Sequence, residues 1–362
     1  MPVKIDITKT HFEIPFFSDA LSIFHKKKKN IKGMFLGAAI GDALGRPVES
    51  KSNQYIIENY GMIIDYQKGG FGNFKDSKLG KTTDDWQLTK SIMESIIDKK
   101  GHFDIDSIAE YHVKSYNESV SGWGGSTREA VEKLKNGSKW DVAGIPDKSS
   151  KKVRGQGNGI VMKMSSLVAL GLSMGRPLTV ETSQLATMTH PSDIAIESAL
   201  CHLSVLTYLL SLKDASEFKS EKFLFAIKLA SLKYQNSSYK APIPSTNKFY
   251  ERLKSLREIT SHTTNKEIIE LFNQGTCYVF DSLAMAYAFI IRDQGIETLY
   301  ETITAGGDAD TTGSIVASML GLLHGIDIFP NHLIMGLDDK KNILEIINIF
   351  SATIFQENLL KN

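Results

Sequence analysis

Helical periodicity runs through most of the sequence after residue 30, and it constrains the fold more than any other feature. Apolar residues recur there at spacings of three and four, which places them on one face of a helix. Strand signals are few, and the best of them, at residues 62–66, is short. Since no repeat stands at a solenoid period, we expect a single compact all-α domain over residues 31–362. Helices are predicted at residues 31–44, 85–98, 104–117, 126–135, 159–174, 181–188, 192–213, 220–234, 247–257, 265–272, 279–293, 296–303, 311–324 and 340–358.

The first of these helices is rich in glycine. Gly37, Gly41 and Gly45 lie on it, and the first two are four residues apart. Glycine inside a helix costs up to about 1 kcal/mol relative to alanine, so close packing or a ligand is the usual reason to keep it. We therefore expect a second helix to approach this one closely.

Two acidic motifs, far apart in the sequence, each stand where a helix should begin. They are residues 82–85 and residues 306–313. Because Asp and Thr are preferred helix N-caps, capping alone explains either motif. The density of carboxylates exceeds what capping needs, however, and the second motif opens on two glycines that permit close backbone approach. If the fold joins the motifs, their carboxylates need a counter-charge, which a pair of divalent cations would supply.

Glycine-rich loops precede two further predicted helices, at residues 154–159 and 122–128. A loop of this kind exposes backbone N–H groups and can hold a phosphate, although many such loops only turn the chain. The first loop follows no strand, and it matches neither the dinucleotide-binding fingerprint nor a P-loop. The candidate ligand-binding residues in the two loops are Gly157, Asn158, Gly159, Gly125 and Ser126.

The overall composition is that of a globular protein, with 42% hydrophobic and 23% charged residues. The net charge of +1 gives no basic excess, so we do not expect nucleic acid as a partner. Cys201 and Cys277 form neither a metal-ligand spacing nor a disulfide framework, which fits the cytoplasm. We see no signal-peptide core and no run of about 18 uninterrupted apolar residues, so no membrane association is expected.

Residues 1–30 differ from the remainder of the chain, and we treat them as an N-terminal extension. They carry Phe12, Phe16 and Phe17 and a run of four lysines at residues 26–29. A lysine run is most often a solvated face, and the aromatic residues can pack on the domain as a strap. The alternative is an arm that binds a partner protein.

Several segments stand in an order that is known from one family. They are residues 37–49, 83–85, 157–162, 189–191, 278–283 and 306–311. Together they resemble the ADP-ribosylglycohydrolase family, which includes the dinitrogenase-reductase-activating glycohydrolases. The first segment is similar to the glycine-rich first helix of the family, and residues 83–85 and 306–311 are similar to its two metal motifs. Residues 157–162 resemble its Gly-Asn-Gly-x-x-Met loop.

The resemblance implies an all-helical fold with a binuclear Mg²⁺ or Mn²⁺ site. Carried over by position, the metal ligands are Thr83, Asp84, Asp85, Asp308, Asp310 and Thr311. All six offer oxygen, which suits hard cations. Asp84 and Asp85 are implied to combine metal binding with acid–base catalysis, and Glu49 is a further catalytic candidate. Asp42 either shares in this chemistry or organises the helix N-termini by hydrogen bonding, and both roles stay open.

For the ADP-ribose itself, the resemblance places the pyrophosphate at residues 155–159, with residues 124–126 as an alternative surface. Asn158 would bind ribose or phosphate, unless it is only a turn residue. His190 is a ligand candidate whose alternative is a buried or capping histidine. Tyr278 would stack on the adenine, although aromatic residues at helical spacing usually belong to the core.

Two residues depart from the pattern of the family. Trp86 stands where a small or hydroxyl residue is usual, and beside the metals it would narrow the pocket or offer a stacking plane. Lys163 replaces the more common arginine after Met162. We expect the first change to affect which modified residue fits, and the second to be tolerated.

The function that the resemblance implies is metal-dependent hydrolysis of an ADP-ribose glycosidic bond on a protein side chain, most simply an arginine. The expected partner is then an ADP-ribosylated protein. A hypothesis of another class is an immunity-type protein that occludes an ADP-ribosyltransferase toxin through residues 1–30, with or without hydrolysis. The intact acidic set favours catalysis, because a purely structural role would not need so many carboxylates together. The N-terminal extension favours binding.

Overall fold

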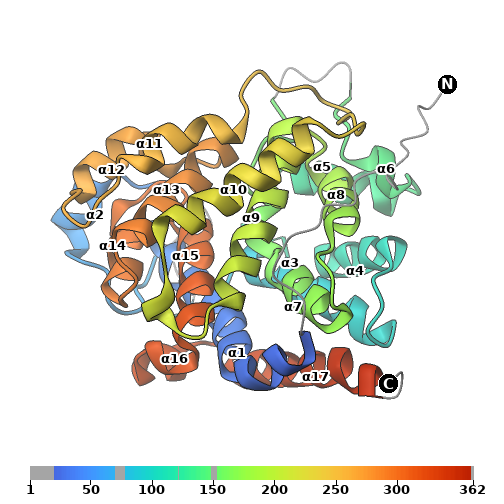
Figure 1. The fold of residues 1–362 in the computed structure, drawn as a ribbon, viewed down its shortest axis with the longest axis horizontal. Helices are drawn as coiled ribbons and strands as arrows, with labels where there is room; N and C mark the ends of the chain where they lie inside the picture. The colour runs from blue at the N-terminus through green and yellow to red at the C-terminus, as the bar shows by residue number, and fades with distance from the viewer. Residues whose placement is uncertain (1–19, 70–77, 121, 148–152, 360–362) are drawn as a thin grey trace.

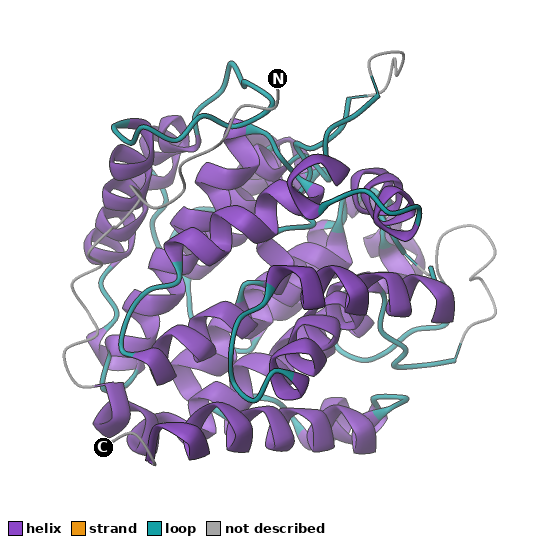
Figure 2. Ribbon diagram, turned by 90° about the vertical axis from the view of Figure 1, so that its right-hand side faces the viewer, coloured by secondary structure: helices purple, strands orange, loops and turns teal. Residues whose placement is uncertain are grey.

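The structure is a computed structural model that describes residues 20–69, 78–120, 122–147 and 153–359. Within these ranges it is built from α-helices and short 3₁₀ turns and contains no strand, which confirms the predicted all-α fold (Figure 2). The strand predicted at residues 62–66 does not form. Ile63 and Tyr66 are buried there as parts of an irregular segment, and the Ile63 N–H donates to the side chain of Thr304 and not to a second strand.

Seventeen helices are present in the described part of the chain (Figure 1). They are α1 (Ala20–Gly45), α2 (Asn53–Tyr60), α3 (Asp84–Asp98), α4 (Ile105–Glu118), α5 (Gly125–Lys135), α6 (Trp140–Ala143), α7 (Ser165–Met174), α8 (Thr179–Thr189), α9 (Asp193–Ser211), α10 (Ser220–Gln235), α11 (Leu253–Arg257), α12 (Asn265–Leu271), α13 (Val279–Arg292), α14 (Glu297–Ala305), α15 (Ala309–His324), α16 (Asn331–Gly336) and α17 (Lys340–Leu359).

The centre of the molecule is an antiparallel pair formed by α1 and α15. Small residues meet across it at every fourth position, in the pairs Gly33–Gly321, Gly37–Ala317, Gly41–Gly313 and Gly45–Ala309. A Cβ atom on Gly41 would lie 2.1 Å from the carbonyl oxygen of Gly313, so the two backbones are in contact. The close approach expected from the glycines of the first helix is therefore present, and α15 is the partner.

This pairing decides where the acidic motifs lie. Because α1 and α15 run in opposite directions, the end of α1 with Asp42 stands beside the start of α15 with Asp310. The first turn of α3 reaches the same place, since the Thr83 N–H donates to both carboxylate oxygens of Asp42 at 2.9 Å. Segments from the two ends of the chain thus meet at one point.

Helix α9 is a further core helix, which packs against α15, α13 and α10. It is long and apolar enough to cross a membrane by length and composition, but 94% of its most apolar window is buried inside the fold. Its buried carboxylate is satisfied within the fold, because the Glu197 side chain accepts from the Phe249 N–H at 2.9 Å and from the Ser231 hydroxyl. Burial among other helices accounts for its apolar character.

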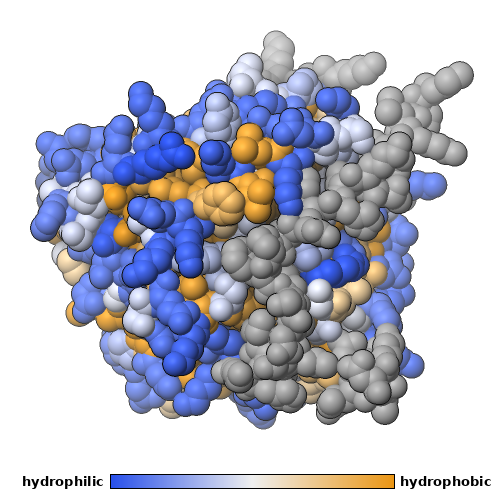
Figure 3. Space-filling view, viewed as in Figure 1, coloured by the Kyte–Doolittle hydropathy of each residue, from blue (hydrophilic) through white to orange (hydrophobic). Residues whose placement is uncertain are grey.

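The surface seen in Figure 3 is mostly hydrophilic, with an exposed hydrophobic area over α10 and its neighbours. Phe225 and Leu232 of α10 are among the large hydrophobic residues that are exposed. Neither residue lines the cavities described below.

Helix α1 begins at Ala20 and therefore runs through residue 30, where we placed the end of the N-terminal extension. Lys27 is buried at 6% exposure, and its ammonium group donates to the carbonyl of Lys213 at 2.8 Å. The lysine run is thus only partly a solvated face. Phe12, Phe16 and Phe17 lie outside the described residues.

Candidate functional site

The two acidic motifs meet at the adjacent N-termini of α3 and α15. The Thr311 hydroxyl donates to a carboxylate oxygen of Asp85 at 3.2 Å, and the Thr83 hydroxyl lies 3.4 Å from Asp310. Carboxylate oxygens gather there in two groups, each within 4.8 Å: Asp42, Asp85 and Asp310 form one, and Glu49, Asp308 and Asp310 form the other. The fold therefore brings the six predicted ligands and Glu49 into one small region.

Helix capping does not account for this acidity. Thr83 and Asp308 are the N-cap residues of α3 and α15, yet neither side chain makes a capping hydrogen bond. The cap of α3 comes from elsewhere, because Asp42 accepts from the Thr83 N–H, the Thr83 hydroxyl and, at 3.0 Å, the Trp86 N–H. Of the two roles left open for Asp42, hydrogen bonding that organises the helix terminus is the one the geometry displays.

The carboxylates of the cluster are buried together, and this burial raises their pKa values. Burial raises the pKa of Asp42 to about 6, in part against the hydrogen bonds from Thr83 and Trp86. Burial, then the charges of Asp42 and Asp308, raises the pKa of Asp84 to about 7. Burial and the Asp308 and Asp84 charges raise that of Glu49 to about 8. Without a further cation, part of the cluster takes up protons near neutral pH.

One oxygen in the cluster has no protein partner. Oδ1 of Asp85 is buried and makes no hydrogen bond, while Oδ2 of the same group accepts from Thr311. An unpartnered buried carboxylate oxygen is costly unless a cation or a proton satisfies it. The predicted ligands and Glu49 offer only oxygen atoms of Asp, Glu and Thr as ligand atoms, so these residues fit a hard divalent cation.

The protein places two of its own cations near these acids. Arg46 lies near Asp42, Asp310 and Glu49 and interacts with their charges. Lys163 is fully buried, and its ammonium nitrogen lies 3.4 Å from Nε2 of His112. Burial lowers the pKa of Lys163 to about 7, against the opposing charges of Asp84 and Asp85.

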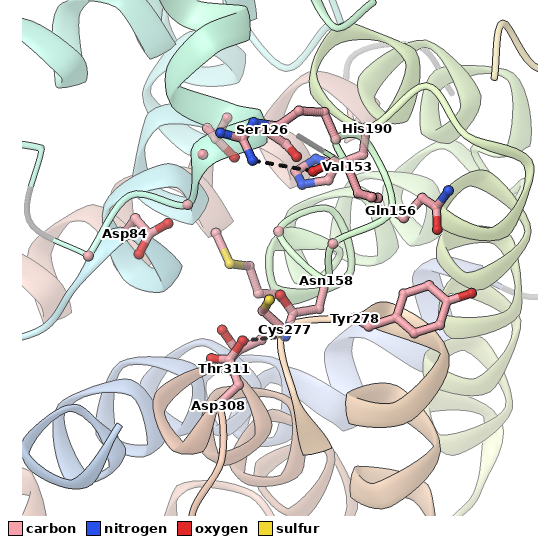
Figure 4. A pocket seen from close by; sticks show the side chains of 18 of the residues that line it. Asp84, Ser126, Val153, Gln156, Asn158, His190, Cys277, Tyr278, Asp308 and Thr311 are labelled. Carbon is pink, nitrogen blue, oxygen red and sulfur yellow. Dashed lines mark hydrogen bonds between the residues drawn. The ribbon is translucent and has the colours of Figure 1, made fainter. Parts of the chain in front are cut away.

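A cavity of about 600 Å³ opens beside the cluster, within the size range of small-molecule sites (Figure 4). Asp84 stands at one side of it and Tyr278 at the other, with Asp308 and Thr311 below Asn158 and Cys277. Glu49, Asp84, Asp308, Asp310 and Thr311 line it, whereas Thr83 and Asp85 lie behind its wall.

The Gly157–Gly159 loop forms the next part of the wall. The side chain of Asn158 donates to Oδ2 of Asp308 at 2.9 Å, and its backbone N–H donates to the carbonyl of Cys277 at 3.0 Å. Asn158 is therefore more than a turn residue, because it ties the loop both to the acidic cluster and to the segment before α13.

The second glycine-rich loop lies against the first. The Gly155 N–H donates to the Ser126 hydroxyl at 2.9 Å, and the guanidinium of Arg154 packs over Gly125. Arg154 is held by Glu129 at 2.7 Å. Sequence reasoning treated the two loops as alternatives, but they form one continuous surface of the cavity, with Arg154 as its cation.

His190 lines the cavity and also supports the loop. It is buried, its Nδ1 lies 2.9 Å from the Thr189 hydroxyl, and burial lowers its pKa to about 3. A Cβ atom on Gly159 would lie 2.8 Å from the His190 ring. The ring is thus a neutral wall behind the loop, which combines the ligand-lining and structural interpretations.

The position expected for Trp86 is wrong. Its side chain is 4% exposed, belongs to the hydrophobic core and lines neither cavity. A helix turns about 100° per residue, so a residue two positions after Asp84 faces nearly the opposite way. Trp86 therefore neither narrows the pocket nor offers a stacking plane there.

Sequence reasoning missed several residues of this site. Arg154, Cys277 and Asn247 line the cavity, and Asn247 donates to the Tyr278 hydroxyl at 3.0 Å. The available signals were that Arg154 is the first residue of the glycine-rich loop and that Cys277 directly precedes the segment 278–283. Lys163 stood out in the sequence as the residue after Met162, but its contact with His112 did not, and Asn247 carries no local signal because it reaches the site through tertiary contacts alone.

Residues 25–358 match a family model described as ADP-ribosylglycohydrolase. The chain therefore belongs to the ADP-ribosylglycohydrolase family, whose activity is the hydrolytic removal of ADP-ribose and whose members use divalent metals.

Curated relatives of this chain carry corresponding names. It is 23% identical to the ADP-ribosyl-[dinitrogen reductase] glycohydrolase of Rhodospirillum rubrum, over 85% of this chain and 90% of the relative. It is also 23% identical to ADP-ribosylhydrolase ARH3 of Xenopus tropicalis, over 83% of this chain and 88% of the relative.

A solved structure described as an ADP-ribosylglycohydrolase-related protein complex has the same fold, with a TM-score of 0.65. The alignment covers 91% of this chain and 99% of the other, at 21% identity.

Proposed function

We propose that this protein is a metal-dependent hydrolase that removes ADP-ribose from a modified protein side chain, with an arginine linkage as the leading substrate. The observation that carries the proposal is the unpartnered, buried Oδ1 of Asp85 within a set of oxygen donors that borders a ligand-sized cavity. Family membership supplies the reaction class.

Thr83, Asp84, Asp85, Asp308, Asp310 and Thr311 are the residues that would hold the metals, Mg²⁺ or Mn²⁺. When bound, the metals supply charge that binds ribose hydroxyls and stabilises the developing transition state. Asp42 contributes indirectly, because its three hydrogen bonds fix the first turn of α3 and hence the direction of Asp84 and Asp85.

The loop residues bind the sugar nucleotide in this proposal. The N–H groups of Gly155 and Asn158 are already used within the protein, so we assign the pyrophosphate to the N–H groups of Gly157 and Gly159 and to Arg154. Asn158 faces a ribose hydroxyl beside Asp308. Tyr278, half-buried at the far side of the cavity, receives the adenine ring.

Proton transfer falls to the acids that line the cavity. Water attacks the anomeric carbon, the bond to the side chain breaks, and the departing nitrogen or oxygen takes a proton. Glu49 and Asp84 line the cavity beside the proposed metal ligands, which places their carboxyl groups within reach of the attacking water and the leaving group. Asp85 lies behind the wall, so its role is to hold metal.

An arginine linkage fits because its guanidinium is cationic and the wall at Glu49 and Asp308 is acidic.

The test measures release of ADP-ribose from an arginine-ADP-ribosylated protein, with Mg²⁺ and with EDTA, for the wild type and Asp308→Ala. We expect release that requires Mg²⁺ and is lost in the variant while its fold, checked by circular dichroism, is retained. Release that continues in EDTA at the same rate would contradict metal dependence. No release by a folded wild type would exclude the arginine linkage and direct the test to serine-linked substrates.

A further inference from the structure

A second cavity lies on the other side of the acidic cluster. It has a volume of about 880 Å³. Five residues line both cavities and so form the wall between them: Glu49, Gly122, Gly124, Cys277 and Asp308. Two of the five are acids of the proposed catalytic cluster, so the reaction centre stands at the junction of the two spaces.

The charges of the second cavity differ from those of the junction. Apart from Glu49 and Asp308 in the shared wall, the charged residues that line it in the described part of the chain are Lys51 and Arg128. Uncharged polar residues complete it, among them Ser50 and Gln274. Once the shared acids are engaged at the cluster, the remaining charge of this space is positive.

The walls of the second cavity are held by hydrogen bonds. The carbonyl of Lys51 accepts from the Gly307 N–H at 3.0 Å and from the Gln274 side chain at 2.9 Å. On the other side, Arg128 donates to the carbonyl of Trp123 at 3.1 Å, and the buried indole of Trp123 donates to Gln87 at 2.8 Å. Lys51 and Arg128 are therefore attached to anchored segments on the two sides of the space.

We propose that the second cavity is the acceptor side of the site: it holds the modified residue and the peptide that flanks it, and it favours flanking carboxylates. The proposal rests on the proposed hydrolase function. If the sugar nucleotide fills the first cavity, its anomeric carbon lies at the shared wall, so the bond to the protein points into the second. Asp or Glu residues beside the modified position would then face Lys51 and Arg128, whereas Lys or Arg residues would be repelled.

The experiment uses two ADP-ribosylated peptides that share the modified residue and length but carry Asp or Lys residues on both flanks. For the full-length wild type with Mg²⁺, we expect a higher kcat/KM for the acidic peptide, by roughly three- to fivefold for each charge pair formed, mainly through KM. Arg128→Glu and Lys51→Glu should each lower or invert this ratio. Since a loss of folding would reduce both peptides alike, the ratio reports charge recognition and not stability.

A matched control changes the same charge elsewhere. Lys222 is exposed on α10 and lines neither cavity, so Lys222→Glu should keep the wild-type preference. Binding of both peptides is also measured by titration, which gives the ratio of their Kd values without turnover.

The outcomes separate the two proposals. Hydrolysis and binding of both peptides at equal efficiency, unchanged by Arg128→Glu, would overturn the acceptor-side proposal and leave the hydrolase intact. Absence of hydrolysis with a charge preference in binding would overturn the proposed hydrolysis of this linkage and retain the acceptor cavity. If Lys222→Glu changed the ratio of the two kcat/KM values as much as Arg128→Glu does, the preference would be an effect of net charge. This result would also overturn the acceptor-side proposal.

Discussion

The carboxylates of Asp42, Glu49 and Asp84 share a small buried volume, and each has a raised pKa because burial disfavours its charged form. Burial likewise holds the pKa of Asp85 and Asp310 well above its usual value. The folded protein therefore binds protons at this site that the unfolded chain releases. In the proposed function, a metal ion would compete with these protons for the same oxygen atoms.

This competition predicts how stability depends on pH. Raised folded-state pKa values contribute stability that is complete below the unfolded values, near 4, and is lost as pH rises through about 6 to 8. In EDTA, we expect these carboxylates to lower the Tm between pH 5 and pH 7. Added Mg²⁺ should raise the Tm more at pH 7 than at pH 5, measured by calorimetry. The lowered pKa of His190 acts in the opposite direction between about 3 and 6.5, and that of Lys163 above about 7, so the test is the difference in Tm with and without Mg²⁺ at each pH. An Mg²⁺ shift of equal size at both pH values would contradict the prediction.

Lys163 is a second residue with a specific prediction. Its buried ammonium group interacts with the negative charges of Asp84 and Asp85, so it would repel a divalent cation bound to the same carboxylates. Lys163→Met removes this charge at similar volume and should tighten Mn²⁺ binding several-fold in a calorimetric titration. Lys27 is also buried but lies by Lys213, so Lys27→Met should leave Mn²⁺ affinity unchanged. Weaker binding in Lys163→Met than in the wild type would show that the lysine supports the site and does not compete with the metal.

Among the elements, the pairing of α1 with α15 sets the distance between the two halves of the cluster. The contact is backbone to backbone, with no side chain between the helices at Gly41 and Gly313. The spacing of the carboxylates at the adjoining helix ends is therefore set by direct contact of the two helix backbones more than by side-chain packing.

Gly41→Ala tests this arrangement. The new Cβ atom would lie 2.1 Å from the Gly313 carbonyl oxygen, and a backbone atom cannot move aside alone. We expect the helices to separate. The free energy of unfolding should fall by about 1–3 kcal/mol, and the affinity for Mg²⁺ should fall as well. Gly295→Ala is the control, because a Cβ atom there meets only the ends of the Glu297 and Asp293 side chains. Denaturant unfolding and metal titration check both variants; unchanged affinity in Gly41→Ala would refute the structural role of the contact.

The sequence predicted the helices and site residues that regular apolar spacing and dense local motifs indicate. Helices α3 and α13 lie within one residue of their predicted bounds, 85–98 and 279–293, because their apolar spacing is regular. The start of α1 was not predictable: Lys27 follows polar residues, and its carbonyl partner, Lys213, is remote in sequence. The acidic residues were found because their motifs are dense. The second cavity was not, since segments distant in sequence build it.

For the whole molecule, the N-terminal segment divides at the start of α1. Removal of residues 1–28 would delete the first turns of this helix together with Lys27, whereas removal of residues 1–19 leaves the described fold complete. We expect the shorter truncation to keep the Tm and the hydrolysis of a small substrate, and the longer one to lower the Tm. Comparison of both truncations by thermal unfolding checks this.

The same pair of truncations tests whether the segment is a partner-binding arm. If residues 1–19 bind an ADP-ribosyltransferase, the shorter truncation should lose the complex in size-exclusion chromatography while retaining hydrolysis. A complex that survives the shorter truncation would refute the binding role of these residues.

The pairing of α1 with α15 also has a consequence for biosynthesis. Helix α1 leaves the ribosome early, but its glycine face finds its partner only when residues 309–321 have been translated, which takes roughly 15–50 s at ordinary elongation rates. Until then the carboxylates of the two motifs cannot stand together. The nascent chain therefore lacks the complete metal site that we propose, so a metal ion would bind only in the last moments of synthesis or after release.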